Sequence, residues 1–324
     1  MVNLSPIVER RRFASLLGMQ DRDGWIWYDG KFVPWRQATT HVLTHSLHYG
    51  LTVIEGIRAY AGPDGAARVF RLDVHLRRFF DSAKAYRMPL PYSLAELESA
   101  HLNLLIKNEL TSAYLRPIAF YGPEKMGVSP RGAQVHVAIA AFPWHSTLSE
   151  GAAERGIRVK TSSFACYATN TGLSRAKVAA NYTNSMLAIQ EAHEDGYDDA
   201  LRLDTAGFVA EGSGANLFLV SSGRLIEPEP TSALLGITRD SVRALAKDLG
   251  LEAQVRRLTR DDVYLADEAF FTGTAAEVVP IVELDRRQIG EGEAGPITRA
   301  LRTAYLSAVS GRDERYAHWL KRAA

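Results

Sequence analysis

The sequence predicts a mixed α/β and α+β protein of two domains, a small N-terminal α/β domain followed by a larger domain built on antiparallel strands. Three observations carry this prediction. The chain has 324 residues, which is long for one hydrophobic core. Strand patterns and helix patterns alternate along it, and a stretch without periodicity lies near its middle. We therefore expect domains at residues 1–143 and 157–324, joined by an interdomain linker at 144–156.

The N-terminal domain opens with a predicted hairpin. Residues 25–33 read WIWYDGKFV, in which apolar and polar residues alternate around Asp29-Gly30, a preferred pair for a tight hairpin turn. Two longer strands are expected from Leu115 to Tyr121 and from Val135 to Phe142, because both are dominated by apolar and β-forming residues. These two strands would form a sheet.

Two helices would cover one face of that sheet. The first begins at Asp73, and its spacing predicts an apolar face formed by Leu76, Phe79, Phe80 and Ala83. The same spacing turns Arg78 away from the apolar face, so periodicity alone predicts a surface residue. Ser93 and Glu96 form a capping box that predicts the start of the second helix.

The C-terminal domain is predicted as an antiparallel meander with helices around it. Helices are expected at about 182–192 and 238–249, the second ending before Gly250. Between them, turn residues separate four apolar segments that predict strands, DALRLD, FVAEG, ANLFLV and RLIE.

Composition excludes several classes of protein. Lys and Arg number 38 against 37 Asp and Glu, and this balance lacks the basic field of nucleic-acid and membrane-surface proteins. No apolar run could span a bilayer, and no secretory signal is expected in the N-terminal residues. The single cysteine, Cys166, cannot form an internal disulfide and is expected to be a buried, inert thiol. We expect a cytoplasmic protein.

Lys177 is the first candidate for chemistry. It lies among Ala176, Val178, Ala179 and Ala180, just before a predicted helix. Such an apolar setting disfavours the ammonium form, and a lysine that spends time neutral can form a Schiff base. The competing interpretation is an ordinary solvated lysine before an alanine-rich helix.

Glu211 ends an apolar strand directly before a Gly-Ser-Gly turn. A carboxylate there either caps the strand end or points into a crevice, and the second role requires a cationic partner. The glycine spacing does not fit a dinucleotide loop, since a strand follows where a helix should begin.

Two short segments are typical of anion sites. Gly236-Ile237-Thr238 lies at a predicted helix start, where backbone N–H groups and the helix dipole favour a phosphate. Thr272-Gly273-Thr274-Ala275 follows an apolar strand and can form a similar nest. Each alone is more simply a structural turn, but together they suggest one small phosphate ligand.

No metal site is expected. His41, His45 and His48 have no acidic residue among them, and their segment is predicted as strand or loop, where this spacing does not bring three rings together.

A series of ordered motifs covers about residues 22–310 and reads HVLTHSLHYG, EGIRAY, HLRRFFDSAK, NELTSAYLRPIAFYG, MGVSP, AAFPW, SRAK, NYTNS, EGSGANLF, LGITRD and FTGTAAEVVPI. In this order the motifs resemble the branched-chain amino acid aminotransferases of the fold-type IV, or class IV, pyridoxal-phosphate family. The resemblance implies the two-domain fold-type IV architecture, with a pseudo-barrel in the C-terminal domain.

The resemblance also implies a site for pyridoxal 5′-phosphate. Lys177 would form the internal aldimine and shuttle the proton at the substrate Cα, Glu211 would pair with the pyridine nitrogen, and Tyr182 would hydrogen-bond the phenolic oxygen. Arg78, Ile237, Thr238 and Thr274 would hold the phosphate. The full set of implied cofactor-binding residues is Arg78, Lys177, Tyr182, Glu211, Leu234, Ile237, Thr238 and Thr274.

For substrate, the resemblance implies that Tyr114 and amides near Thr274 and Ala275 bind the α-carboxylate. Arg116, on the same strand face as Tyr114, would meet the γ-carboxylate of glutamate together with Tyr49. Met126 and Val128 belong to a loop that reaches the neighbouring subunit's site in this family, so at least a homodimer is expected. The implied substrate-binding residues are Tyr49, Ile54, Arg58, Tyr114, Arg116, Met126, Val128, Thr274 and Ala275.

Two positions depart from the family pattern. Ile54 stands where Phe or Tyr is usual, and Ser146 and Thr147 stand where a pocket tyrosine is common. One missing ring removes on the order of 100 Å² of apolar wall, which at about 25 cal/mol per Å² redirects a few kcal/mol of side-chain binding. We expect a roomier pocket that accepts bulkier side chains or amines.

The resemblance implies transamination of branched-chain L-amino acids by a ping-pong mechanism, with 2-oxoglutarate as amino acceptor. Two alternatives share the fold. An amine or D-amino acid transaminase is disfavoured by Tyr114, Arg116 and the EGIR motif, although Ile54 weakens that argument. An aminodeoxychorismate lyase, which releases pyruvate by β-elimination, lacks the YLRP and MGVSP pattern.

Overall fold

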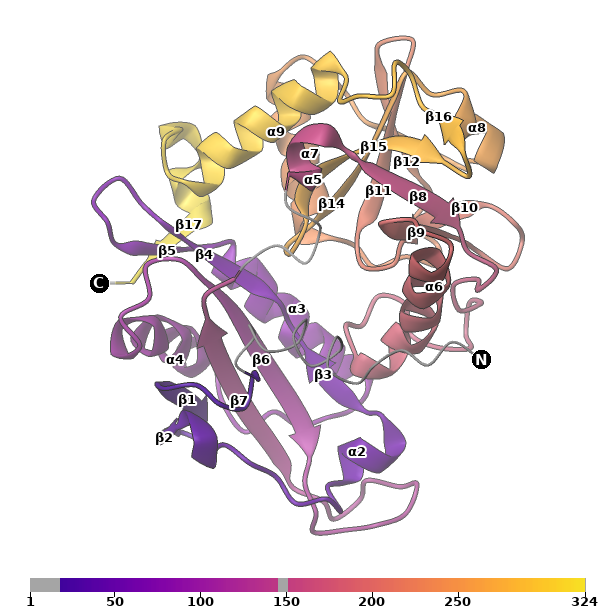
Figure 1. Cartoon of the computed structure of the whole chain (residues 1–324). Coiled ribbons are helices and arrows are strands. Elements are labelled where there is room, and N and C mark those ends of the chain that lie inside the picture. Colours follow the sequence, from indigo (N-terminus) through magenta and orange to yellow (C-terminus); the bar gives the residue numbers. More distant parts are fainter. Residues whose placement is uncertain (1–17, 145–150, 324) are drawn as a thin grey trace, which may run out of the picture.

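The computed structural model describes residues 18–144 and 151–323, which form two β-sheets with helices packed around them (Figure 1). Most strands of the first sheet lie in the indigo-to-magenta part of the chain, with one strand from the yellow C-terminal end, and the second sheet lies in the magenta-to-yellow part. Helix α3 lies between the two regions, so its residues can contact both.

The first sheet has the strand order β17-β5-β4-β6-β7-β1-β2, and β3 pairs with β6. Tyr28 pairs with Lys31, and Asp29 and Gly30 have φ of 45° and 82°, which confirms the predicted tight hairpin. The strands are β1 (Trp25–Tyr28), β2 (Lys31–Pro34), β3 (Thr52–Ile54), β4 (Ile57–Ala61), β5 (Ala67–Phe70), β6 (Ala113–Tyr121), β7 (Val135–Phe142) and β17 (Leu320–Arg322).

Helices α3 (Leu72–Ala85) and α4 (Leu94–Lys107) bury their apolar faces against this sheet, as predicted. Ser93 and Glu96 make the expected capping box at the start of α4. The shared core contains apolar side chains of both helices and of the strands beneath them, among them Leu76, Phe79, Leu97, Leu104, Leu115 and Val137.

The second sheet has the order β10-β9-β8-β15-β14-β11-β12-β13, and β16 pairs with β15. The strands are β8 (Ile157–Thr161), β9 (Asp199–Leu203), β10 (Val209–Gly212), β11 (Asn216–Ser221), β12 (Arg224–Pro228), β13 (Gln254–Arg256), β14 (Glu268–Gly273), β15 (Glu277–Leu284) and β16 (Arg287–Gln288).

The four predicted strands are present, and they pair antiparallel as β9 with β10 and β11 with β12 within one curled sheet. The Gly212 N–H donates to the Ala215 carbonyl at 2.7 Å, so a tight turn joins β10 directly to β11 although four strands separate them in the sheet order. β8 runs parallel to both β9 and β15. Strand periodicity carries no information on direction, so these parallel pairings could not be predicted.

Helices pack around the second sheet. α6 and α7 start within one residue of the predicted positions and extend close to the predicted ends. The helices of this part of the chain are α5 (Ala152–Arg155), α6 (Thr183–Glu194), α7 (Ile237–Asp248), α8 (Arg260–Tyr264) and α9 (Pro296–Val309). Short 3-10 helices lie at Trp35–Gln37, Ala179–Tyr182 and Glu314–Trp319, and α2 (His45–Tyr49) lies in the first part.

The two sheets do not divide at one point of the chain. β17, near the C-terminus, pairs antiparallel with β5 of the first sheet, and Phe70 of β5 packs edge to face with Tyr305 and Trp319. The predicted linker at 144–156 is described only in part and includes α5, so the domain limits stay a prediction. Among the described residues, no helix is long and apolar enough to span a bilayer.

Candidate active site

One cavity lies where the two halves of the molecule meet. Its wall includes α3, the segment before α6, β9 and β10, the turn after β10, the start of α7 and the end of β14. All eight residues that the resemblance assigns to the cofactor line this cavity, namely Arg78, Lys177, Tyr182, Glu211, Leu234, Ile237, Thr238 and Thr274. The two segments predicted to bind an anion therefore border one space.

Lys177 enters the cavity from a backbone that is fixed on both sides. Its N–H donates to Ser82 Oγ of α3 at 2.9 Å, and its carbonyl accepts the N–H of Ile54 at 3.0 Å. The next residue, Val178, forms a β-bridge with Val53. The Lys177 amine lies 2.5 Å from the Tyr182 hydroxyl. The first sheet thus holds the backbone of Lys177, while its side chain contacts the tyrosine that precedes α6.

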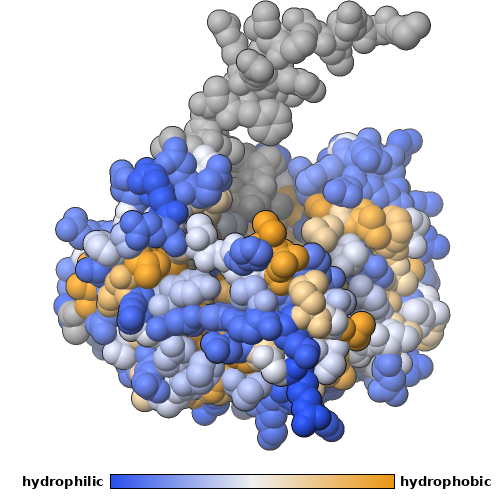
Figure 2. All heavy atoms as spheres, turned by 90° about the horizontal axis from the view of Figure 1, so that it is seen from below, coloured by the Kyte–Doolittle hydropathy of each residue, from blue (hydrophilic) through white to orange (hydrophobic). Residues whose placement is uncertain are grey.

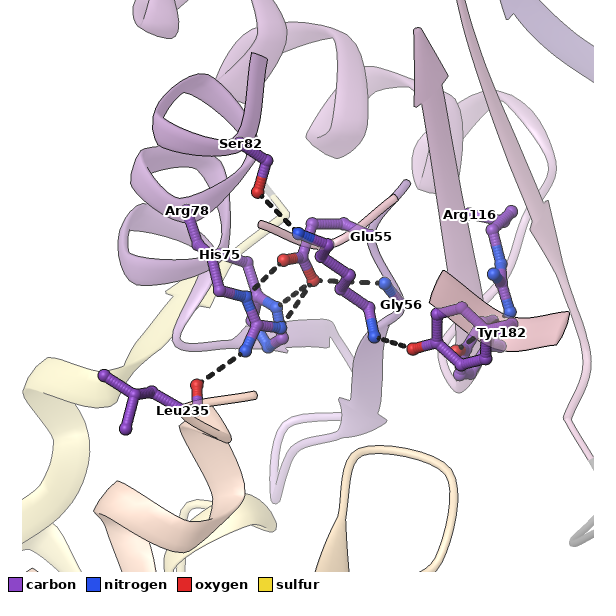
Figure 3. A network of polar contacts seen from close by, with 10 residues as sticks. Glu55, Gly56, His75, Arg78, Ser82, Arg116, Tyr182 and Leu235 are labelled. Carbon is purple, nitrogen blue, oxygen red and sulfur yellow. Dashed lines mark hydrogen bonds and ion pairs between the residues drawn. The ribbon is translucent and has the colours of Figure 1, made fainter. Parts of the chain in front are cut away.

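Arg78 is not the surface residue that helix periodicity predicts. Its side chain is 14% exposed, and its Nε and Nη2 donate to the two carboxylate oxygens of Glu55 at 2.5 and 3.0 Å. Nη1 donates to the Leu235 carbonyl at 2.9 Å, just before α7 (Figure 3). Helix periodicity predicts only which face of α3 packs on its own sheet. Arg78 lies on another face of α3, which contacts the second half of the molecule.

Glu55 is fully buried and was not among the predicted site residues. His75 Nδ1 lies 2.8 Å from its Oε2, and the Gly56 N–H donates to the same oxygen. Burial by itself would raise the pKa of Glu55, but the charge of Arg78 and the contact with His75 hold that pKa well below its usual range. Burial lowers the pKa of His75, so we assign it as a neutral ring that donates Nδ1–H.

Glu211 has the cationic partner that its interpretation as a crevice carboxylate requires. Arg202 Nη2 donates to Glu211 Oε1 at 2.6 Å, and the Leu234 N–H donates to Oε2 at 3.2 Å. Burial raises the pKa of Glu211, while the charge of Arg202 opposes that shift. Sequence reasoning missed Arg202, although a basic residue between two leucines of the DALRLD strand was an available signal.

The start of α7 lets a ligand in the cavity come close to the backbone. Gly236 precedes the helix with extended backbone, and no side chain caps the first turn. A Cβ at Gly236 would lie 2.0 Å from Asn216 Oδ1, while Asn216 Nδ2 donates to the Leu234 carbonyl. Thr238 is 2% exposed and lines the cavity. This arrangement presents backbone N–H groups and one hydroxyl to an anion.

Tyr114 and Arg116 contact each other, as their shared strand face predicts. Arg116 Nη2 donates to the Tyr114 hydroxyl at 3.3 Å, and the Tyr114 ring stacks on Trp144 with centroids 4.5 Å apart. A Cβ on Gly56 would lie 1.9 Å from that hydroxyl, so the glycine makes room for the tyrosine. Neither Tyr114 nor Arg116 belongs to the cavity wall.

Arg58 of β4 pairs with Glu277 and does not line the cavity. Its Nη1 lies 3.0 Å from Glu277 Oε1, and the hydroxyl of Tyr60 donates to the same oxygen at 2.8 Å. Glu277 closes the turn after β14 that carries Thr274 and Ala275. Of the substrate residues that the resemblance implies, only Thr274 lines the cavity; Ile54 and Ala275 adjoin residues of its wall in sequence or by hydrogen bond.

The remaining implied substrate residues lie on an exposed face. Met126 and Val128 are 42% and 83% exposed in the loop between β6 and β7, and Tyr49 of α2 is 41% exposed. His45 Nε2 contacts the Gly127 carbonyl at 2.8 Å and links α2 to this loop. The structure brings none of these three into the cavity of the same chain. Ser146 and Thr147 lie outside the described residues.

The histidine segment is partly helical, where the sequence predicts strand or loop. α2 starts at His45 because Thr44 begins a short turn that ends at Gly50 with φ of 75°. His45 and His48 each contact a backbone carbonyl, and His41 Nδ1 accepts the Leu43 N–H. Cys166 is buried at the cavity wall, and burial raises the pKa of its thiol to about 12, as expected for an inert cysteine.

Comparison with known proteins identifies the family of this chain. The model of the amino-transferase class IV family matches residues 52–284. The chain belongs to the class IV aminotransferases. This confirms the family resemblance and the fold-type IV architecture that it implies.

Proteins of known structure or curated name match this chain over nearly its whole length. The branched-chain-amino-acid aminotransferase of Pseudomonas aeruginosa is 52% identical over 303 residues, which are 94% of this chain and 98% of that protein. The T.th. branched-chain amino acid aminotransferase complexed with N-(5′-phosphopyridoxyl)-L-glutamate is 47% identical, with a TM-score of 0.90 and coverage of 94% and 99%. Its complex with 4-methylvaleric acid has the same identity and coverage and a TM-score of 0.89.

The buried Glu55 pair generates a pH-dependent prediction. Glu55→Gln should lower the free energy of unfolding by about 3 kcal/mol at neutral pH, because Arg78 loses its buried counter-charge. The pKa of folded Glu55 lies below the value of about 4.3 for an unfolded chain. This contribution is therefore fully present above that pH and is lost as pH falls through the folded-state pKa.

Urea unfolding of the wild type and the variant across the acid range measures this difference. Glu291→Gln in an exposed turn is the control and should change stability by less than about 0.5 kcal/mol. A difference between wild type and Glu55→Gln that stays constant down to the acid limit would contradict the assignment of Glu55 as a stabilised carboxylate.

Proposed function

We propose that this chain is a pyridoxal-phosphate-dependent branched-chain amino acid aminotransferase that uses 2-oxoglutarate as its amino acceptor. The observation that carries the proposal is one cavity with an anion cradle, a lysine amine and a buried carboxylate in its wall. The names of the similar proteins support the reaction and the substrate class.

The cavity residues fit pyridoxal phosphate in charge and chemistry. Arg78, the uncapped start of α7 and the Thr238 hydroxyl suit a phosphate. Lys177 offers an amine to an aldehyde, and Glu211 offers a carboxylate to a ring nitrogen. When bound, the cofactor supplies an aldehyde that exchanges amino groups and a ring that accepts the electron pair released at the substrate Cα.

Lys177 is the proposed acid and base of the reaction. Its amine would take the proton from the substrate Cα and deliver it to the C4′ carbon of the cofactor. The Tyr182 hydroxyl, 2.5 Å from this amine, orients it and is the group available to the phenolic oxygen of the cofactor. The fixed Lys177 backbone limits the amine to a short range of positions, which favours proton transfer at one carbon.

We propose that Tyr114 and the amides near Thr274 and Ala275 bind the substrate α-carboxylate. Arg116 would bind the second carboxylate of glutamate or 2-oxoglutarate with help from Tyr49, and an apolar side chain would leave the arginine unused. Arg58 and Tyr60 both hold Glu277, and this contact fixes the turn that carries Thr274 and Ala275. The complexes of the T.th. enzyme with a glutamate adduct and with 4-methylvaleric acid support both kinds of ligand.

A half-reaction tests the proposal. Addition of L-glutamate to the purified holoenzyme should convert the visible absorbance of bound pyridoxal phosphate to that of the pyridoxamine form, because the amino group passes to the cofactor and 2-oxoglutarate leaves. Lys177→Ala should lack the visible band and the conversion, whereas Lys31→Ala, at the exposed start of β2, should retain both. Absence of any change with glutamate, leucine or an amine would exclude a transaminase.

Two alternatives remain within the fold. A D-amino acid or amine transaminase would respond to D-alanine or a simple chiral amine and not to L-leucine. An aminodeoxychorismate lyase would release pyruvate without converting the cofactor. The contact of Arg116 with Tyr114 favours a substrate carboxylate and therefore an amino acid aminotransferase.

Ile54 generates a prediction on substrate range. Its N–H contacts the Lys177 carbonyl, so this residue lies directly beside the reactive segment. The wild type should turn over phenylalanine alongside leucine and valine. Ile54→Phe should lower kcat/KM for phenylalanine relative to valine about tenfold or more, because the added ring fills pocket volume. Steady-state kinetics with these substrates and one chiral amine measure the change.

The matched control is Ile106→Phe, at a position 48% exposed on α4, which should leave the ratio unchanged. A wild-type enzyme restricted to valine and isoleucine would overturn the proposal of a roomier pocket.

We also propose a homodimer whose active sites lie near the interface. Large apolar side chains gather on α2, its approach and the loop between β6 and β7, where a contact through His45 joins these elements. Figure 2, seen from the side on which α2 lies, shows apolar side chains among hydrophilic ones. The exposed apolar residues of these segments are Val42, Leu43, Leu47, Tyr49, Met126 and Val128.

A cytoplasmic location remains a prediction from cysteine usage.

Sedimentation tests the dimer. The wild type should sediment as at least a dimer, and Val128→Asp should shift it toward monomer by burying a charge in the interface. Leu265→Asp is the matched control, since Leu265 and Val128 are 80% and 83% exposed, and it should leave the dimer intact. A monomeric wild type would contradict the proposal.

A further inference from the structure

Arg202 faces Glu211 because of a local irregularity in the second sheet. β9 and β10 pair with a register shift between Val209 and Glu211, which sets Glu211 directly opposite Arg202. Side chains of directly opposed residues lie on the same face of an antiparallel pair. Arg202 is 4% exposed, and its Nε donates to the Gly212 carbonyl at 3.1 Å while Nη2 donates to Glu211. The guanidinium is thus fixed to backbone on one side and carboxylate on the other.

The charges around Glu211 are few. Arg202 contacts it from β9, Lys177 acts on it from the segment before α6, and the nearby Cys166 thiol stays neutral. A buried carboxylate without a counter-charge takes up a proton in preference to remaining charged. The charge on Lys177 is given up when its amine reacts, whereas a guanidinium stays charged at any accessible pH. Arg202 is therefore the permanent counter-charge of Glu211.

We propose that Arg202 is a positioning residue that keeps Glu211 a carboxylate, so that the proton shared between Glu211 and the pyridine nitrogen lies on the nitrogen. This inference rests on the proposed function. A buried acid and a ring nitrogen can share one proton either as an ion pair or as a neutral pair, and low polarity favours the neutral pair. Arg202 stabilises the carboxylate of the ion pair from a distance of 2.6 Å. The ring nitrogen then retains the proton, as electron withdrawal from the substrate Cα requires.

The test uses holoenzyme loaded with ¹⁵N-labelled pyridoxal phosphate, whose nitrogen resonance distinguishes a protonated ring from a neutral one. The wild type should show a protonated nitrogen. Arg202→Gln keeps a hydrogen-bond donor but removes the charge, and its resonance should shift to the neutral position. Arg202→Lys restores the charge and should return the resonance toward the wild-type position. Arg158→Met, on neighbouring β8, is the control and should leave it unchanged.

Proton uptake on cofactor binding gives a second readout. Wild-type apoenzyme should take up about one proton more than Arg202→Gln, because Glu211 of the variant already carries that proton. Should Arg202→Gln not fold, Arg202→Met is measured in its place with the same expectation. A protonated nitrogen in either uncharged variant overturns the inference. Wild-type protein that fails to bind pyridoxal phosphate overturns the proposed function instead.

Discussion

The buried carboxylate of Glu55 is the constraint on which the site depends. Its two oxygens bind Arg78, and Arg78 in turn reaches the Leu235 carbonyl at the entrance to α7. Helix α3 is therefore held by ionic contact to its own sheet and by a hydrogen bond to the other half of the molecule. The same helix supplies Ser82, which receives the Lys177 N–H. One ion pair thereby links the start of α7, the proposed anion cradle, to the helix that holds the backbone of Lys177.

The second half of the molecule repeats this arrangement. Glu211 is bound by Arg202, and fully buried Glu227 of β12 lies 2.6 Å from Nε of Arg239 on α7. Each pair brings an arginine beside an element that borders the cavity. Such pairs contribute little net stability, but breaking one leaves an uncompensated buried charge. Near-neutral overall charge is consistent with this arrangement, since Arg78 and Arg202 at the site are each paired with a carboxylate.

Local signals in the sequence predicted local structure well. The Asp29-Gly30 hairpin and the Ser93 capping box need only a few neighbouring residues, and both are present. Roles for the candidate site residues were predicted from the order of the family motifs. All eight residues predicted to bind the cofactor line one cavity. Arg78 was misjudged, and Arg202 was missed, because each has its decisive partner on another element. Helix periodicity and strand composition do not describe such distant pairings.

The pairing of β17 with β5 has a consequence for synthesis of the chain. Until residues 320–322 leave the ribosome, β5 presents an unpaired strand edge, and such edges recruit other chains. The apolar surface of Phe70 stays uncovered for the same interval, because Tyr305 and Trp319 follow late in the chain. The first sheet to begin forming is thus the last to be completed, and its edge at β5 stays unpaired for most of the synthesis of the chain.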